Sequence, residues 1–206
     1  MSDIKKIDVR NLVRDSYKKI AISNSKKSGC CDSNELSLKK SALEISRKIG
    51  YSDEEILGAP EETNMGLGCG NPQLIAKIKS GETVIDLGCG GGFDCFLASK
   101  KVGANGYIIG VDMTSEMITS ARRSCKRHQY KNVDFRLGEI ENLPVADNTA
   151  DVIISNCVIN LSPNKQRVYN EAYRVLKKGG RVAISDIVLM KELTSEMKQD
   201  EKLYCG

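Results

Sequence analysis

The chain has 206 residues, of which 40% are hydrophobic and 28% carry a charge, as in an ordinary globular domain. Lys and Arg exceed Asp and Glu by only 31 to 27, and the basic residues are spread along the chain, which argues against a nucleic-acid partner. No apolar run is long enough to span a bilayer, and the N-terminus lacks the apolar core of a signal peptide. We therefore expect a cytoplasmic protein without a membrane partner.

Eight cysteines are many for a reducing compartment, where disulfide frameworks are unusual. Thiols in such proteins are metal ligands, catalytic groups or small core residues. A structural metal is not expected, because there is no Cys-x-x-Cys pair and the chain has a single histidine. The role of each cysteine therefore depends on the motif around it.

The first part of the chain is expected to be helical. Residues 4–22 and 36–49 show helical spacing, with a polar segment at 23–34 between them. Ser52 to Glu55 form a capping box that opens a short third helix. Asn71 and Pro72 then begin a helix over residues 73–79. We expect residues 1–70 to form a helical segment with cysteine loops, and residues 71–206 to form a second region.

The second region alternates strands and helices, which predicts an α/β fold with a mainly parallel sheet flanked by helices. The final helix is expected to start at Ser162-Pro163 and to end before Lys177-Lys178 and Gly179-Gly180. The expected strands are at 84–87, 107–111, 133–136, 151–155 and 181–187, and the expected helices at 94–101, 115–127 and 163–176.

A glycine-rich loop follows the first expected strand, with glycines at 88, 90 and 92. Without a Cβ the backbone can turn sharply and approach a ligand closely. A dinucleotide fingerprint needs glycine at the sixth loop position, where Phe93 stands, and this disfavours a nicotinamide-dependent dehydrogenase. The pattern Asp-x-Gly-x-Gly-x-Gly resembles the first motif of Rossmann-like class I methyltransferases that use S-adenosylmethionine.

This resemblance implies cofactor contacts after successive strands, at the carboxyl edge of the sheet. Asp112 would accept hydrogen bonds from the ribose hydroxyls. Glu139 would lie beside the adenine amino group with Ile140 against the ring, although Glu139 and Glu141 could equally be solvated loop acids. Asp86 would hold the loop amides or approach the amino-acid end of the cofactor. The full set of expected contacts is Tyr17, Asp86, Gly88, Cys89, Gly90, Gly92, Asp112, Met113, Glu139, Ile140 and Asn156.

Two heptapeptides centred on cysteine make the resemblance more specific. They are Gly-Leu-Gly-Cys-Gly-Asn-Pro at 66–72 and Ser-Asn-Cys-Val-Ile-Asn-Leu at 155–161. Together with residues 9–17, Gly-Cys-Cys at 29–31 and Gly-Tyr-Ser at 50–52, they resemble the arsenite S-adenosylmethionine methyltransferase family over nearly the whole chain.

The family resemblance implies that Cys69 and Cys157 bind trivalent arsenic as thiolates, and that Cys30 or Cys31 takes part in binding or in the redox cycle. Trivalent arsenic is soft and prefers sulfur ligands. Three sulfurs would leave its lone pair free to take the cofactor methyl group, so no general acid or base is needed. The implied substrate is arsenite or methylarsenite, and the implied reductant is an external thiol system of the thioredoxin or glutathione type.

The remaining cysteines and the end of the chain leave alternatives open. We expect Cys89, Cys95 and Cys125 to pack as small hydrophobes. The family continues with a strand pair that the 18 residues after Val188 cannot form, and its further arsenic-binding cysteine would fall just after Gly206, where Cys205 is a neighbouring substitute. We therefore expect a C-terminally truncated chain. Methylation of a small organic acceptor such as a quinone precursor, or binding without turnover, are the alternative functions.

Overall fold

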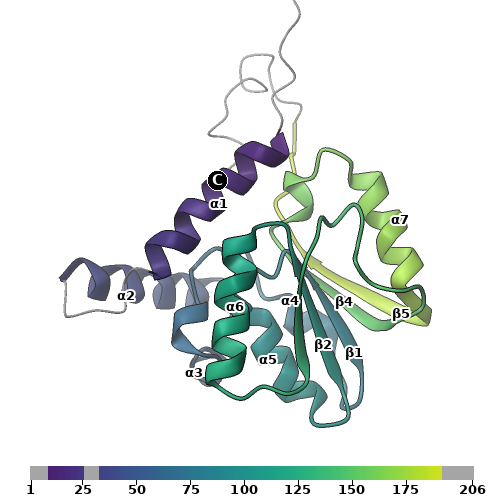
Figure 1. Cartoon of the computed structure of the whole chain (residues 1–206), viewed down its shortest axis with the longest axis horizontal. Helices are drawn as coiled ribbons and strands as arrows, with labels where there is room; N and C mark the ends of the chain where they lie inside the picture. Colours follow the sequence, from purple (N-terminus) through teal and green to yellow (C-terminus); the bar gives the residue numbers. More distant parts are fainter. Residues whose placement is uncertain (1–8, 26–32, 192–206) are drawn as a thin grey trace, which may run out of the picture.

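The computed structural model describes residues 9–25 and 33–191, and its centre is one parallel sheet (Figure 1). The strand order is β3-β2-β1-β4-β5, and every neighbouring pair is parallel. This confirms the predicted α/β fold. The strands are β1 (Thr83–Leu87), β2 (Tyr107–Asp112), β3 (Val133–Leu137), β4 (Ala150–Asn156) and β5 (Leu176–Ser185).

Helices cover the sheet on both faces (Figure 1). Because side chains alternate along a strand, Val84 packs into a core shared with Phe96 of α5 (Phe93–Val102) and Ile118 of α6 (Ser115–Arg127). Its neighbour Ile85 packs on the opposite side against Val168 of α7 (Lys165–Val175). Burial on both faces explains why the central strands are continuous apolar runs.

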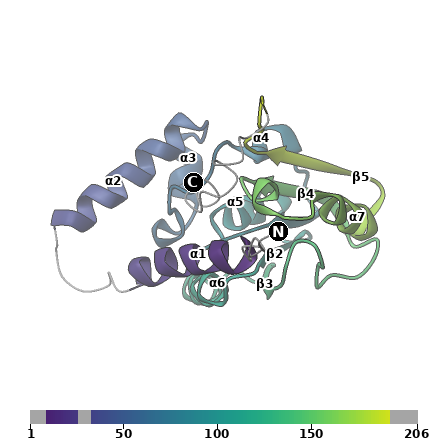
Figure 2. The same ribbon diagram turned by 90° about the horizontal axis from the view of Figure 1, so that it is seen from above.

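The N-terminal region is helical, as predicted, with α1 (Val9–Ser25), α2 (Ser33–Lys48), α3 (Asp53–Gly58) and α4 (Pro72–Ala76). Figure 2 shows α1 alongside α6, and the two helices are in contact. The capping box of α3 is present, since the Ser52 hydroxyl accepts from the Glu55 amide and the Glu55 carboxylate accepts from the Ser52 amide, both at 3.1 Å. Helix α4 ends three residues earlier than predicted, because Lys77 adopts a left-handed conformation with φ of 47°.

The segment between α7 and β5 differs from the prediction. Helix α7 begins at Lys165, because the side chain of Asn164 caps it by accepting from the amide of Arg167. The helix ends at Val175, and β5 starts at once. β5 pairs at Leu176 with Ala150 and again at Arg181 with Val152, so the residues between them bulge out of the ladder. The Lys-Lys-Gly-Gly run is therefore a bulge, with φ of 85° at Gly179, and not a helix end.

Two features of the sheet position the functional site. Strand β5 is at the edge, and within the described ranges no strand pairs with its outer side. Strand β1 lies between β2 and β4, so the loops after β1 and β4 diverge at their carboxyl ends and leave a crevice. Among the described helices, none combines the length and apolar character needed to cross a bilayer.

Candidate cofactor and cysteine site

A cavity opens at the carboxyl edge of the sheet, where the crevice between β1 and β4 lies. Nine of the eleven expected cofactor contacts line it, together with Cys157. Gly92, Glu139 and Cys69 are not among the lining residues. The nine are Tyr17, Asp86, Gly88, Cys89, Gly90, Asp112, Met113, Ile140 and Asn156.

The glycine loop forms the floor of the cavity, and its glycines serve different purposes. Gly88, Gly90 and Gly92 all have positive φ, at 68°, 51° and 92°. A Cβ on Gly88 would come within 2.5 Å of the Val158 side chain, and one on Gly92 within 2.6 Å of Phe135. A Cβ on Gly90 would meet no atom within 4 Å. Gly88 and Gly92 therefore permit packing, whereas Gly90 keeps space on the cavity side of the loop.

Asp112 is held by backbone amides at the end of β2. Its carboxylate accepts from the amide of Gly90 at 2.9 Å and from the amide of Thr114 at 2.8 Å. Burial raises the pKa of Asp112, and the two amide donors act in the opposite direction. Each carboxylate oxygen has two acceptor positions, so Asp112 can still accept from further donors in the cavity.

Two further carboxyl groups, Asp86 and Asp94, are buried beside the loop. Burial raises the pKa of Asp86 well above its ordinary value, and the nearby charge of Asp94 adds to this rise. The thiol of Cys95 donates to Asp86 at 3.2 Å. Asp94 accepts from the Tyr51 hydroxyl and from the Gln73 amide, both at 2.8 Å. Among the described residues no Lys or Arg is hydrogen bonded to either acid, and such buried acids favour a cationic ligand in the cavity.

Sequence reasoning missed this network around Asp94. The acid itself stands in the glycine-loop stretch, in the first turn of α5. Tyr51 lies in the Gly-Tyr-Ser motif, and Gln73 follows the proline that opens α4. An acid placed just after a glycine loop is a usable signal, but no local pattern indicates its two partners.

The two loop acids after β3 have different environments. Glu139 forms ion pairs with Arg14 at 3.2 Å and Arg10 at 3.6 Å, both from α1. Glu141 is buried, lines the cavity, accepts from the Ser162 hydroxyl at 2.6 Å and forms an ion pair with Arg10 at 3.5 Å. The alternative that Glu141 is a solvated acid is therefore wrong. The Glu139 side chain contacts the arginines of α1 and does not line the cavity.

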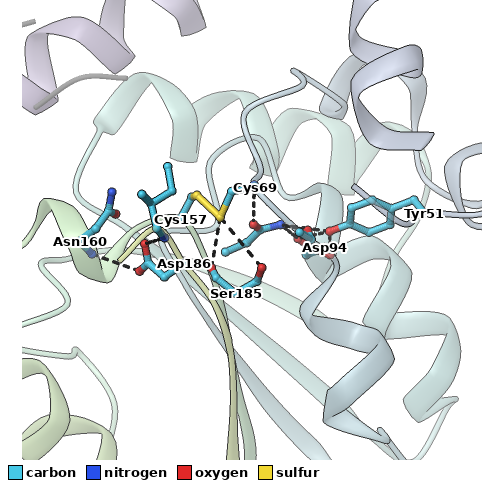
Figure 3. Close-up of a disulfide and its surroundings, with 10 residues drawn as sticks. Tyr51, Cys69, Asp94, Cys157, Asn160, Ser185 and Asp186 are labelled. Atoms are coloured by element: carbon cyan, nitrogen blue, oxygen red, sulfur yellow. Dashed lines mark hydrogen bonds between the residues drawn. A yellow bond between two sulfur atoms is a disulfide. The ribbon is translucent and has the colours of Figure 1, made fainter. Parts of the chain in front are cut away.

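Cys69 and Cys157 meet beside the cavity, although 88 residues separate them in the sequence (Figure 3). Their Cα atoms are 5.8 Å apart, and the two sulfurs form a disulfide. The binding of arsenic by this pair as thiolates stays a prediction, because the structure pairs the two sulfurs with each other. Reduction must precede any binding of arsenic by this pair.

The other described cysteines behave as packing residues. Cys89 and Cys95 are buried, as predicted, and burial raises the pKa of Cys89 to about 11. Burial also raises the pKa of Cys95 well above its ordinary value. Cys125 is half-buried on α6. Cys30, Cys31 and Cys205 lie outside the described residues.

The sequence of the sheet region decides the family. Residues 78–206 match a family model described as a methyltransferase domain. The chain belongs to this methyltransferase domain family. The parallel sheet with its cavity at the carboxyl edge is the architecture expected of a class I methyltransferase domain, which confirms the fold class predicted from the glycine loop.

Similar proteins also confirm the resemblance stated from the cysteine motifs. The chain is 46% identical in sequence to an arsenite methyltransferase from Halobacterium salinarum, and the match covers 97% of this chain and 52% of that protein. An arsenite methyltransferase from Aquipseudomonas alcaligenes is 45% identical over 70% of the chain and 43% of its own length. The chain thus spans about half the length of the curated relatives it matches.

A solved structure shows the same arrangement. The crystal structure of an arsenic(III) S-adenosylmethionine methyltransferase from Chlamydomonas reinhardtii superposes with a TM-score of 0.61 at 36% identity. The match covers 77% of this chain and 54% of that chain. The similarity extends beyond the 129 residues of the family match, since more than three quarters of the chain takes part.

Proposed function

We propose that the protein transfers a methyl group from S-adenosylmethionine to trivalent arsenic held by cysteine thiolates. One observation carries this proposal: Cys69 and Cys157 converge at the carboxyl edge of the sheet, and Cys157 also lines the cavity that contains the glycine loop. A methyl acceptor held by these sulfurs would lie next to the cofactor site. The similarity to arsenite methyltransferases supports the same substrate.

The cavity residues fit S-adenosylmethionine. Gly90 leaves open space over the loop, Asp112 retains acceptor positions for ribose hydroxyls, and Ile140 offers an apolar surface for the adenine ring. The buried Asp86 and Asp94 supply negative charge for the ammonium and sulfonium groups. When bound, S-adenosylmethionine supplies a methyl group on a positively charged sulfur. The roles of Tyr17 and Met113 as further contacts remain part of the proposal, whereas Glu139 pairs with the arginines of α1.

The thiolates serve to bind and orient the arsenic. Reduction of the disulfide frees the sulfurs of Cys69 and Cys157, which are the soft ligands that trivalent arsenic prefers. Within the described ranges, no three side chains of His, Cys, Asp or Glu are grouped to hold one ion. We assign the third sulfur to Cys30 or Cys31. An external thiol of the thioredoxin or glutathione type would return the cysteines to the reduced state in the cytoplasm.

Methylation can be tested directly. The protein is incubated with arsenite, a dithiol and S-adenosylmethionine labelled in its methyl group, and labelled methylarsenicals are separated by chromatography. We expect labelled product from the unaltered chain, and none from Cys69→Ser or Cys157→Ser variants that still bind the cofactor. A protein that binds both ligands but forms no product would support the binding alternative. Turnover of a quinone precursor that is unaffected by both substitutions would support the organic acceptor.

A further inference from the structure

Asn156, the last residue of β4, joins this strand to the loop that carries Cys69. Its side-chain oxygen accepts from the amide of Cys69 at 3.0 Å, and its side-chain nitrogen donates to the carbonyl of Gly70 at 2.8 Å. The carboxamide therefore bonds to the main chain on both sides of the Cys69 carbonyl. Cys157 directly follows Asn156 in the chain. Asn156 is therefore linked to Cys157 by a peptide bond and to the Cys69 loop by hydrogen bonds.

The carboxamide of Asn156 is fully used as a donor within the protein. Its nitrogen has two hydrogens, and besides Gly70 it reaches the Tyr51 hydroxyl at 3.2 Å and Asp94 at 3.4 Å. The Tyr51 hydroxyl in turn donates to Asp94. Asn156 was expected among the cofactor contacts, but these bonds leave it no free donor. The network instead connects the Cys69 loop to the first turn of α5.

The backbone around both cysteines is shaped for this contact. A Cβ on Gly68 would come within 2.7 Å of the Asn156 side-chain nitrogen, so the loop can lie this close only because residue 68 is glycine. Cys157 has a left-handed backbone with φ of 56°, and its amide donates to the Ser185 carbonyl at 2.8 Å. The Cys69 sulfur lies 3.5 Å from the same carbonyl oxygen. Asn156 is the side-chain link that keeps this loop in place.

We propose that Asn156 is the positioning residue that brings Cys69 to Cys157, and so sets the effective concentration of the two thiols at the arsenic site. The role of Asn156 at an arsenic site rests on the proposed function. Without the Asn156 side chain, the amide of Cys69 and the carbonyl of Gly70 lose their partners, and the loop is free to move away from β4. The two thiols would then meet less often.

The thiol pair can be measured without arsenic or cofactor. The protein is equilibrated with mixtures of reduced and oxidised glutathione, quenched by alkylation, and the Cys69 and Cys157 peptides are quantified by mass spectrometry. In this exchange one glutathione disulfide takes two electrons and the two cysteine protons and becomes two thiols, while Cys69 and Cys157 form one S–S bond. The equilibrium constant is the effective concentration of the pair.

We expect Asn156→Ala to lower this equilibrium constant about tenfold, the size expected from losing hydrogen bonds to two backbone groups. Asn160→Ala is the matched control, because Asn160 is an asparagine four residues further along the chain, and its side-chain oxygen has no hydrogen-bond partner among the described residues. Both variants are measured under conditions where urea titration shows them folded. An equilibrium constant for Asn156→Ala that equals that of Asn160→Ala overturns the proposal.

A second variant covers the case in which Asn156→Ala does not fold. Asn156→Asp has the same shape and keeps the acceptor for the Cys69 amide, but it cannot donate to Gly70, so its equilibrium constant should also fall. An unchanged value would overturn the proposal. Failure of the unaltered chain to methylate arsenic would refute the proposed function alone, since the glutathione equilibrium requires neither arsenic nor S-adenosylmethionine.

Discussion

Replacing Asp86 by asparagine should stabilise the cofactor-free protein at neutral pH. Asp86 is 3% exposed and accepts a hydrogen bond from the thiol of Cys95, and no Lys or Arg of residues 9–25 or 33–191 is hydrogen bonded to it. Burial and the charge of Asp94 raise its pKa, so the folded protein binds a proton that the unfolded chain releases. Between the unfolded and folded pKa values, stability then falls as the pH rises.

The size of the effect is bounded by the cost of keeping this carboxyl protonated. With an ordinary pKa of about 3.9, protonation at pH 7 costs at most about 4 kcal/mol, and at pH 5 about 1.5 kcal/mol. An amide side chain of the same shape avoids this cost and can still accept from Cys95. The advantage of Asp86→Asn should therefore grow with pH, and should vanish near pH 4.

Urea unfolding followed by circular dichroism at pH 5, 6 and 7, without cofactor, measures this advantage. Asp134→Asn is the control, because Asp134 is a partly exposed acid paired with Arg136 and should change stability by less than about 0.5 kcal/mol. A variant at Asp86 that is less stable than the unaltered protein at pH 7, or whose advantage does not change with pH, would refute the reasoning. Calorimetry should show weaker binding of S-adenosylmethionine to Asp86→Asn, because asparagine cannot release a proton to become a negative partner for the cationic cofactor.

Three further substitutions test the loop and the helix above it. Gly88→Ala should destabilise the protein by about 2–4 kcal/mol in urea unfolding, because φ is 68° and the Cβ meets Val158. Gly90→Ala should lower the free energy of unfolding by only about 1 kcal/mol, since its Cβ meets no atom within 4 Å. The same substitution should abolish binding of S-adenosylmethionine in calorimetry. Intact binding would show that the cofactor does not lie against Gly90. Arg14→Ala should cost less than about 1 kcal/mol, and this cost should disappear in high salt, because its ion pair with Glu139 is partly exposed.

The sheet and the cofactor loop could be predicted from the sequence because their signals are local. Buried parallel strands are short apolar runs, and the loop after β1 must be glycine-rich where φ is positive. The same local reasoning predicted the end of α7 to within one residue, at 176 where the structure has Val175, but it missed that the Lys-Lys-Gly-Gly run belongs to β5. A basic pair followed by glycines is typical of a helix end, but there the β4–β5 ladder decides the conformation, and the segment becomes a bulge.

The partners of the site residues could not be predicted, because they come from distant segments. Glu139 and Glu141 are two positions apart in one loop and both pair with Arg10 of α1, but only Glu141 is buried and accepts from Ser162. Likewise, nothing near Asp94 in the sequence indicates Tyr51 or Gln73. These hydrogen bonds join side chains that are 21 to 125 positions apart in the sequence. They follow from the fold and cannot be predicted from sequence periodicity.

The glycines beside Cys69 show how far motif reasoning can go. From the sequence, a glycine-rich stretch around a cysteine suggests a loop that can fold over the sheet edge. In the structure, a Cβ at Gly68 would collide with Asn156, and one at Gly70 would collide with the Ser185 hydroxyl. These two glycines are therefore required for close approach to β4 and β5, since each faces a side chain that borders the cysteine pair. Replacing either glycine by alanine should therefore move the loop away from β4 and β5 and displace Cys69 from Cys157.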